Sequence, residues 1–329
     1  MITIKKYNKT YAKQWDDFII ASNNGTIFQL QKFLNYHITR KFTDYSILIM
    51  QNNKIIAAIS GAVKIKNNKK TYYSHPGASY GGLIIKKNLN FNKINQIIEL
   101  LNNYLKKKKF QSVFLINSPS IYWQFPEQTV DYLLQWHKYH IQELYISHAT
   151  YITKKNIIDD LLSKRKKRYI SNDQELKNYS FTKLKNQQDL RFLYGLLEKS
   201  KLKFKTKPTH SLGELKKLTD LFPKEVEIYI SKLNSTIVGG GIIFHATINT
   251  SMIFYNIIDS QMTESQLSAL QLYNCMKICK KRGSTTIDFW VSHTPEHDNP
   301  LQPKLSLIQF KEQFGATGIM RIAYKKELL

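Results

Sequence analysis

One order of secondary structure (strand, strand, strand, helix, strand) occurs twice along the chain, and this repeat constrains the fold more than any single motif. In the first half, two apolar runs rich in β-branched residues flank an Asn-rich turn, as in a β-hairpin. A third strand, a helix with apolar residues three and four apart, and a buried strand follow. The predicted ranges in the first half are 45–50, 55–61, 70–74, 92–109 and 112–116. Those in the second half are 227–231, 236–244, 251–255, 265–282 and 285–289.

The repeat predicts an α/β protein that arose by internal duplication. A length of 329 residues fits about two domains of roughly 150 residues each. We therefore predict an N-terminal domain over 1–153, a basic helical linker over 154–180 and a C-terminal domain over 181–329.

The chain carries a large excess of positive charge. It has 49 Lys and Arg residues against 24 Asp and Glu, a formal net charge of +25. Of these cations 43 are Lys and only 6 are Arg, alongside 39 Ile and 24 Asn. This joint excess is typical of an AT-rich genome, whereas proteins that read nucleic-acid sequence favour Arg. Sequence-specific DNA binding is not expected, but compositional drift and a phosphate-bearing partner both remain open.

Three observations bear on cellular location. No run approaches the roughly 18 apolar residues of a membrane span. The N-terminus, MITIKKYNKTYAKQW, lacks the apolar core of a signal peptide. Two cysteines, Cys275 and Cys279, are too few for a disulfide framework. We expect a soluble protein of the cytoplasm.

Short motifs in both halves resemble those of a known family. They are, in chain order, Asp44-Tyr45-Ser46, Tyr80-Gly81-Gly82-Leu83, Arg282-Gly283 after a helix over 267–281, Ile287-Asp288-Phe289, Phe310-Lys311 and Phe314-Gly315. With the duplicated order of strands, they resemble the GNAT acyltransferase fold in tandem, as in the FemAB-type aminoacyltransferases and related envelope-polysaccharide acyltransferases. In one departure, Trp290 follows Asp-Phe where the family often has Gly.

The resemblance implies two tandem GNAT-like domains, each a twisted mixed β-sheet flanked by helices, with the active cleft between them. It makes Lys311, in the Phe-Lys motif, a catalytic candidate that contacts the donor or acceptor and offsets negative charge in the transition state. Asp288, at a strand end, would act as general base or acceptor anchor. The alternatives are that Lys311 is a surface lysine and that Asp288 is a carboxylate bonded to local backbone. Further candidates for substrate binding are Phe310, His293, Tyr255, Tyr80, Gly82 and Trp290.

Two polar clusters lie outside these motifs. Lys164, Arg165 and Arg168 predict phosphate binding, with a solvated linker helix as the alternative. His293 and His297 have the spacing of a helical zinc pair, but Pro295 between them indicates a loop, so no metal site is predicted.

GNAT-type transfer needs positioning and oxyanion stabilisation, which backbone N–H groups at a splayed strand and a helix N-terminus can supply. Residues 259–267, where a phosphate cradle would lie, lack the Gly-rich loop of acetyl-CoA-binding GNAT enzymes, and no long heptad run suggests a tRNA-binding arm. We predict acyl or aminoacyl transfer from an acyl-CoA-type thioester or an aminoacyl-tRNA to an amine or a hydroxyl of a sugar-containing cell-envelope precursor, with the amine favoured over the hydroxyl. The donor is a co-substrate, no cofactor is tightly bound, and peripheral association with a membrane surface stays open. The alternative is a non-catalytic duplicated module that binds nucleic acid or a nucleotide sugar.

Overall fold

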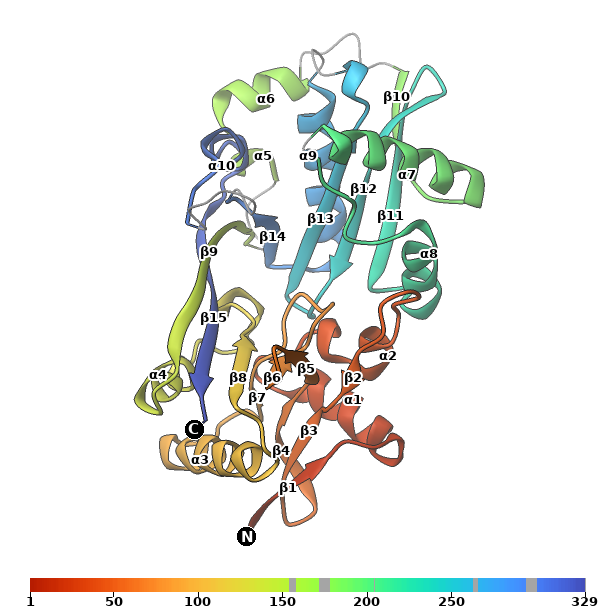
Figure 1. Cartoon of the computed structure of the whole chain (residues 1–329). Coiled ribbons are helices and arrows are strands. Elements are labelled where there is room, and N and C mark those ends of the chain that lie inside the picture. Colours follow the sequence, from red (N-terminus) through yellow and green to blue (C-terminus); the bar gives the residue numbers. More distant parts are fainter. Residues whose placement is uncertain (154–157, 172–177, 204, 263–265, 294–300, 329) are drawn as a thin grey trace. The chain divides into compact units, whose positions relative to one another are not determined.

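The computed structural model describes the chain except for residues 154–157, 172–177, 204, 263–265, 294–300 and 329 (Figure 1). Contacts divide the described residues into two compact units. Unit 1 holds those within Met1–Ile146, Pro295–Gln302 and Met320–Leu329, and unit 2 holds those within Ser147–Thr294 and Pro303–Ile319. Folding domains with boundaries at 153 and 181 stay a prediction.

Unit 1 contains twelve of the named helices and strands. They are β1 (Ile2–Lys6), α1 (Ala12–Ala21), α2 (Gln31–Leu34), β2 (Thr43–Asp44), β3 (Ile47–Gln51), β4 (Lys54–Ile59), β5 (Ala62–Lys66), β6 (Lys69–Ser74), β7 (Ile84–Ile85), α3 (Phe91–Lys107), β8 (Ser112–Ile116) and α4 (Thr129–Trp136). Two longer strands, β9 (His140–Tyr151) and β15 (Thr317–Glu327), contribute residues to both units.

Unit 2 contains the remaining elements. They are α5 (Ile158–Leu161), α6 (Lys164–Ser171), β10 (Tyr179–Lys183), α7 (Gln187–Leu202), α8 (Leu212–Leu221), β11 (Val226–Leu233), β12 (Thr236–His245), β13 (Thr250–Ile258), α9 (Leu267–Arg282), β14 (Thr286–Val291) and α10 (Leu305–Glu312).

The strands of unit 1 form two hydrogen-bonded sets. One has the order β1-β3-β4-β7, and the other has the order β15-β8-β6-β5-β2. The β3–β4 hairpin turns at Asn52 and Asn53, whose φ angles of 49° and 58° fit a two-residue hairpin turn that Asn tolerates. Helix α3 buries one apolar stripe in the core of the unit, as its spacing predicts. The stripe consists of Ile94, Ile97, Ile98, Leu101 and Leu105.

The strands of unit 2 have the order β10-β11-β12-β13-β14-β9. Helices cover both faces, with α9 on one and α7 on the other (Figure 1). Strand β12 allows this close packing through glycines: a Cβ at Gly241 would lie 2.5 Å from Cys275 Sγ of α9, and one at Gly240 would lie 2.8 Å from Leu193 of α7.

The two units share the predicted repeat. In each, a strand that precedes the long helix in the chain pairs in parallel with the strand after that helix: β6 with β8 around α3, where the short β7 also intervenes, and β13 with β14 around α9. The other strand pairings described within each unit are antiparallel. The predicted α/β class, with two GNAT-like units of mixed sheet and flanking helices, is confirmed.

The helices of the described residues were also compared with the length and hydropathy of a membrane span. None of them is both long enough and apolar enough to cross a bilayer.

Candidate active site

The site begins where the parallel ladder between β13 and β14 stops. These strands pair at only three positions, the last being Met252 with Asp288, although β13 continues to Ile258 and β14 to Val291. Strand β13 bulges just beyond, because Ile253 and Tyr255 pair with consecutive residues of β12 and Phe254 is extra. We call this point the unit 2 ladder end.

Strand β14 bulges at the same level. On its other side Asp288 pairs with Ala149 of β9 and Val291 pairs with Ser147, so two residues of β14 lie opposite the single residue His148. One of the two, Trp290, has a φ of 64°, in the left-handed region that suits glycine. The site therefore contains a second irregular strand, with a bulky residue in a strained conformation.

Both predicted catalytic residues hold this bulge. Asp288 is fully buried and its Oδ1 accepts a hydrogen bond of 2.8 Å from the N–H of Trp290. Lys311, on α10, is 5% exposed, and its Nζ donates to the carbonyl oxygens of Trp290 (2.8 Å) and Val291 (2.7 Å). The same Nζ donates to Ser292 Oγ at 2.9 Å. The structure thus brings Asp288, Trp290 and Lys311 together.

A buried histidine completes the cluster. His148 of β9 is 3% exposed, and its Nδ1 lies 2.8 Å from Ser292 Oγ. Burial lowers the pKa of His148, and the positive charge of Lys311 lowers it further, so the imidazole is neutral at neutral pH. Sequence reasoning missed His148 and Ser292. They are 144 positions apart, and neither belongs to a motif.

Aromatic side chains extend the site along β13. The ring of Phe254 lies 5.0 Å from that of Trp290 and 4.7 Å from that of Tyr255. The Tyr255 hydroxyl accepts a hydrogen bond of 3.1 Å from the N–H of Thr209, and burial raises its pKa. Of the predicted substrate-binding residues, Trp290 and Tyr255 are therefore linked through Phe254. His293 is 7% exposed and forms an isolated bridge with Pro303.

Helix α6 contributes a buried lysine near the start of α9. Lys166 Nζ donates to Gln266 Oε1 at 2.9 Å and lies 5.4 Å from the centre of the Phe310 ring. Burial lowers the pKa of Lys166, and the neighbouring Arg165 adds to the effect. The predicted phosphate-binding residues Lys164, Arg165 and Arg168 are on the exposed part of this helix. Sequence reasoning missed Lys166, which is the buried member of the same basic run.

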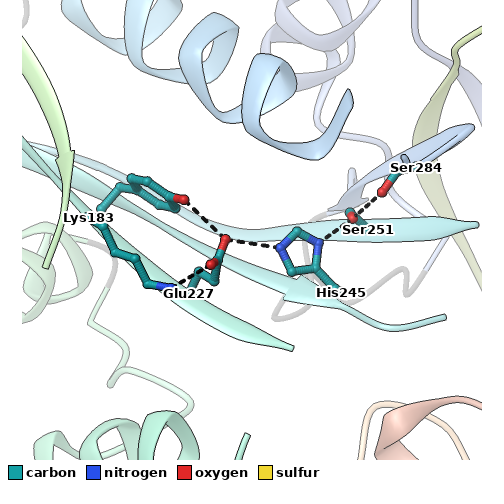
Figure 2. A network of polar contacts seen from close by, with 6 residues as sticks. Lys183, Glu227, His245, Ser251 and Ser284 are labelled. Atoms are coloured by element: carbon teal, nitrogen blue, oxygen red, sulfur yellow. Dashed lines mark hydrogen bonds and ion pairs between the residues drawn. The ribbon is translucent and has the colours of Figure 1, made fainter. Parts of the chain in front are cut away.

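A polar network lies at the other end of β13, where this strand pairs with β14 (Figure 2). Ser251 of β13 lies 2.6 Å from the hydroxyl of Ser284, which precedes β14, and 2.7 Å from His245 Nδ1. His245 Nε2 lies 3.2 Å from Glu227, which also forms an ion pair of 2.6 Å with Lys183. The hydrogen bond from His245 is the largest cause of the lowered Glu227 pKa, about 2. Ser251 is fully buried, so the network has a structural role.

Two further predicted residues lie in unit 1. Tyr80 is 1% exposed, and the guanidinium of Arg321 lies 4.6 Å from the centre of its ring. Gly82 has a φ of 69°, and a Cβ there would come within 2.2 Å of Asn117 Oδ1. The contact of Tyr80 and Gly82 with substrate stays a prediction.

Unit 1 also contains a cavity of about 310 Å³. Its lining combines two cations, one carboxylate, two histidines and an aromatic ring. The lining residues are Leu34, Asn35, His37, Arg40, Lys41, Phe42, Asp44 and His75. Burial lowers the pKa of His75. This lining suits an anionic ligand with a ring to stack.

No group of three or more His, Cys, Asp or Glu side chains within the described ranges is placed to hold a metal ion. Of the His293 and His297 pair, His297 lies outside those ranges, as do 263–265 of the segment before α9.

Comparison with solved structures identifies the fold. The crystal structure of FemX superposes with a TM-score of 0.74 at 12% sequence identity, over 98% of this chain and 97% of that one. A tandem GNAT protein from the clavulanic acid biosynthesis pathway has a TM-score of 0.58 at 8% identity, over 100% and 99%. L-PGS from Bacillus licheniformis has a TM-score of 0.57 at 12% identity, over 95% and 90%. No protein-family model and no curated protein sequence matches the chain. The resemblance predicted from the sequence is confirmed in the fold, a tandem GNAT-like arrangement as in FemX.

Proposed function

We propose that the chain is an acyltransferase that moves an acyl or aminoacyl group to an amine of a sugar-containing cell-envelope precursor. The donor is a CoA-type thioester or an aminoacyl-tRNA, and the reaction takes place in the cytoplasm, where both are made. One observation carries the proposal: bulges on β13 and β14 coincide where their ladder ends, and the Lys311 ammonium is buried there. The FemX-type fold supports the reaction class.

In this mechanism the donor carbonyl sits at the unit 2 ladder end. The free amine of the acceptor adds to that carbonyl carbon, and the C=O electron pair moves onto oxygen. Backbone N–H groups at the bulges and the nearby charge of Lys311 stabilise the oxyanion. Collapse of this tetrahedral intermediate expels the thiolate or the ribose oxygen, and that leaving group takes the proton given up by the amine. Asp288 acts by holding the N–H of Trp290, and Lys311 holds its carbonyl.

The unit 1 cavity supports a separate part of the proposal, the binding of an anionic ligand. Arg40 and Lys41 line the cavity and can pair with a phosphate or carboxylate, while Phe42, His37 and His75 offer ring faces. A nucleotide sugar carries both features. We expect a nucleotide sugar to bind the wild type and to bind at least about tenfold more weakly to the double variant Arg40→Ala, Lys41→Ala.

Turnover tests the proposal. The purified chain is incubated with acyl-CoA mixtures, or with charged tRNA, and with nucleotide sugars and other envelope precursors bearing a free amine. Mass spectrometry should find the acceptor heavier by one acyl group and the donor deacylated in equal amount. Lys311→Met is the control and should form both products at least about 100-fold more slowly. If no combination of donor and precursor reacts, the chain is not this transferase.

A non-catalytic module that binds nucleic acid or a nucleotide sugar is the second candidate. The exposed cations of α6, Lys164, Arg165 and Arg168, favour it. Steep salt dependence of tRNA binding, with no donor consumed, would support this candidate over the transferase.

A further inference from the structure

Trp290 has a backbone conformation that its side chain disfavours. Its φ of 64° lies in the left-handed region, where a residue with a Cβ is strained. Glycine adopts this conformation without strain. A bulky residue in such a position persists when the surrounding structure holds it and its side chain has a use.

The surrounding structure holds both peptide groups of Trp290. Asp288 Oδ1 accepts its N–H, and Lys311 Nζ donates to its carbonyl oxygen. One buried anion and one buried cation therefore fix the left-handed turn from two sides. The direction of the indole ring is set by this backbone.

The ring meets the extra residue of the neighbouring strand. Phe254 is the bulged residue of β13, and its ring lies 5.0 Å from that of Trp290 with an interplanar angle of 34°. Both side chains are partly exposed. Two bulged strands thus each present an aromatic ring to the other, at the point beyond which β13 and β14 no longer pair.

From this geometry we propose that Trp290 is a specificity-determining residue, which with Phe254 limits the size of the acyl group that the site accepts. The proposal rests on the proposed function, since it assumes that the donor carbonyl sits at the unit 2 ladder end. The ring pair occupies the space that a long acyl chain needs, so the donors are those with small acyl or aminoacyl groups. Replacing the indole by hydrogen frees the space that the ring fills and leaves the bulge intact, because Gly suits the backbone there.

Binding of a graded series of small donors tests the proposal. The probes are the acetyl, butyryl, octanoyl and dodecanoyl thioesters of N-acetylcysteamine, titrated by calorimetry into the whole chain. The wild type should bind the acetyl and butyryl compounds and bind the two longer ones weakly. Trp290→Gly should bind the octanoyl compound at least about tenfold more tightly than the wild type does, because even one methylene in an apolar pocket is worth about tenfold or more.

Two variants serve as controls. Trp290→Phe keeps an aromatic ring and should keep the preference for short chains. Trp136→Ala removes an exposed tryptophan of unit 1 and should change nothing. The proposal is overturned if Trp290→Gly and the wild type bind the series in the same order, or if neither binds any member.

Turnover separates this result from the proposed function. A wild type that acylates an envelope precursor, with the same chain-length preference in Trp290→Gly, removes only the role of Trp290. Failure of every donor to react removes the transferase assignment, while the binding series still decides whether Trp290 limits acyl length.

Discussion

The two units contain the same parallel ladder around a long helix, but the backbone at the end of that ladder differs between them. In unit 1 the chain closes the end itself. Ser74 Oγ accepts hydrogen bonds from the N–H groups of Ile116 (2.9 Å) and Gly82 (3.0 Å), and the N–H of Gly81 donates to the Ile116 carbonyl at 2.8 Å. In unit 2 the corresponding end has two bulges, with Trp290 and the ammonium of Lys311 beside them.

The starts of the two long helices differ in the same sense. In unit 1, Asn90 caps α3 by accepting a hydrogen bond from the N–H of Lys93. At the start of α9, Gln266 makes no side-chain cap among the described residues, and the buried cation Lys166 binds its side chain instead. The two units are thus two versions of one scaffold. Unit 1 uses its ladder end for its own stability, and unit 2 is the copy that we expect to perform chemistry.

Removing one buried cation from each unit, Lys311 in unit 2 and Arg321 in unit 1, gives the largest expected contrast. Lys311→Met should lower kcat by about 100- to 1,000-fold, because the transition state loses a fixed positive charge and the bulge loses its donor. Arg321→Met, in unit 1, removes a buried cation that packs on Tyr80, and should lower stability by about 1–3 kcal/mol with kcat nearly unchanged. Steady-state kinetics and thermal unfolding of both variants measure this contrast. Equal losses of kcat in the two variants would contradict the division of roles.

The next largest expected effect is on stability. It comes from substitutions at Gly82 and Trp290, whose positive φ angles favour glycine. Gly82→Ala should destabilise the chain by about 2–4 kcal/mol, since Gly82 has a φ of 69° and the added Cβ would meet Asn117 Oδ1 at 2.2 Å. At Trp290, Gly should be more stable than Ala by about 1 kcal/mol, the reverse of the usual order in a strand. Urea unfolding of Gly82→Ala, Trp290→Gly and Trp290→Ala measures both differences. If Trp290→Ala is more stable than Trp290→Gly, the left-handed turn is not retained in these variants.

One carboxylate in each unit, Glu227 in unit 2 and Asp131 in unit 1, should change the free energy of unfolding with pH in opposite directions. The pKa of Glu227 falls from 4.5 to about 2, so its stabilising effect is present above about pH 4.5 and is lost as the pH falls toward 2. Burial raises the pKa of Asp131 above 3.8, so its effect on stability becomes less favourable as the pH rises through that region. Glu227→Gln should cost roughly 2 kcal/mol near neutral pH and flatten the acid limb, whereas Asp131→Asn should cost less.

Urea unfolding between about pH 2 and about pH 7 distinguishes these two carboxylates. At a pH above both pKa values, each variant removes one negative charge from a chain of net charge +25, so general charge repulsion changes equally in the pair there. Parallel stability curves for Glu227→Gln and Asp131→Asn would rule out the assigned difference.

Local patterns were sufficient for the repeat but not for the site. Spacing of apolar residues predicted α3 to within two residues of its observed bounds, and β8 was predicted with its observed bounds. The left-handed turn at Trp290 left no such signal, because it is imposed by Asp288 and by Lys311, which is 21 positions away. Periodicity reports which face is buried, but not which strands bulge or which distant groups meet across a sheet.

Residue type was equally uninformative within the basic run. The sequence offers Lys164, Arg165, Lys166, Lys167 and Arg168 as similar cations, yet only Lys166 is buried. Its burial follows from packing against Gln266 and Phe310, which are about 100 and 144 positions away. The structure thus divides this cluster into one fixed cation and an exposed set open to an external phosphate.

Charge reversal of that exposed set gives the smallest expected effect on turnover. It tests whether a polyanion binds to the cations of unit 2 in particular. Lys164→Glu, Arg165→Glu and Arg168→Glu together should reduce the slope of log affinity against log salt for tRNA by about 2, since each lost phosphate contact contributes about 0.7. Turnover of a small thioester donor should stay within about twofold of wild type, because the three side chains are exposed and lie outside the contacts of Lys311. Reversal of Lys106, Lys107 and Lys108, at the exposed end of α3 in unit 1, is the matched control. If that control reduces the slope as much, the attraction belongs to the overall charge of +25 and the two units do not differ in it.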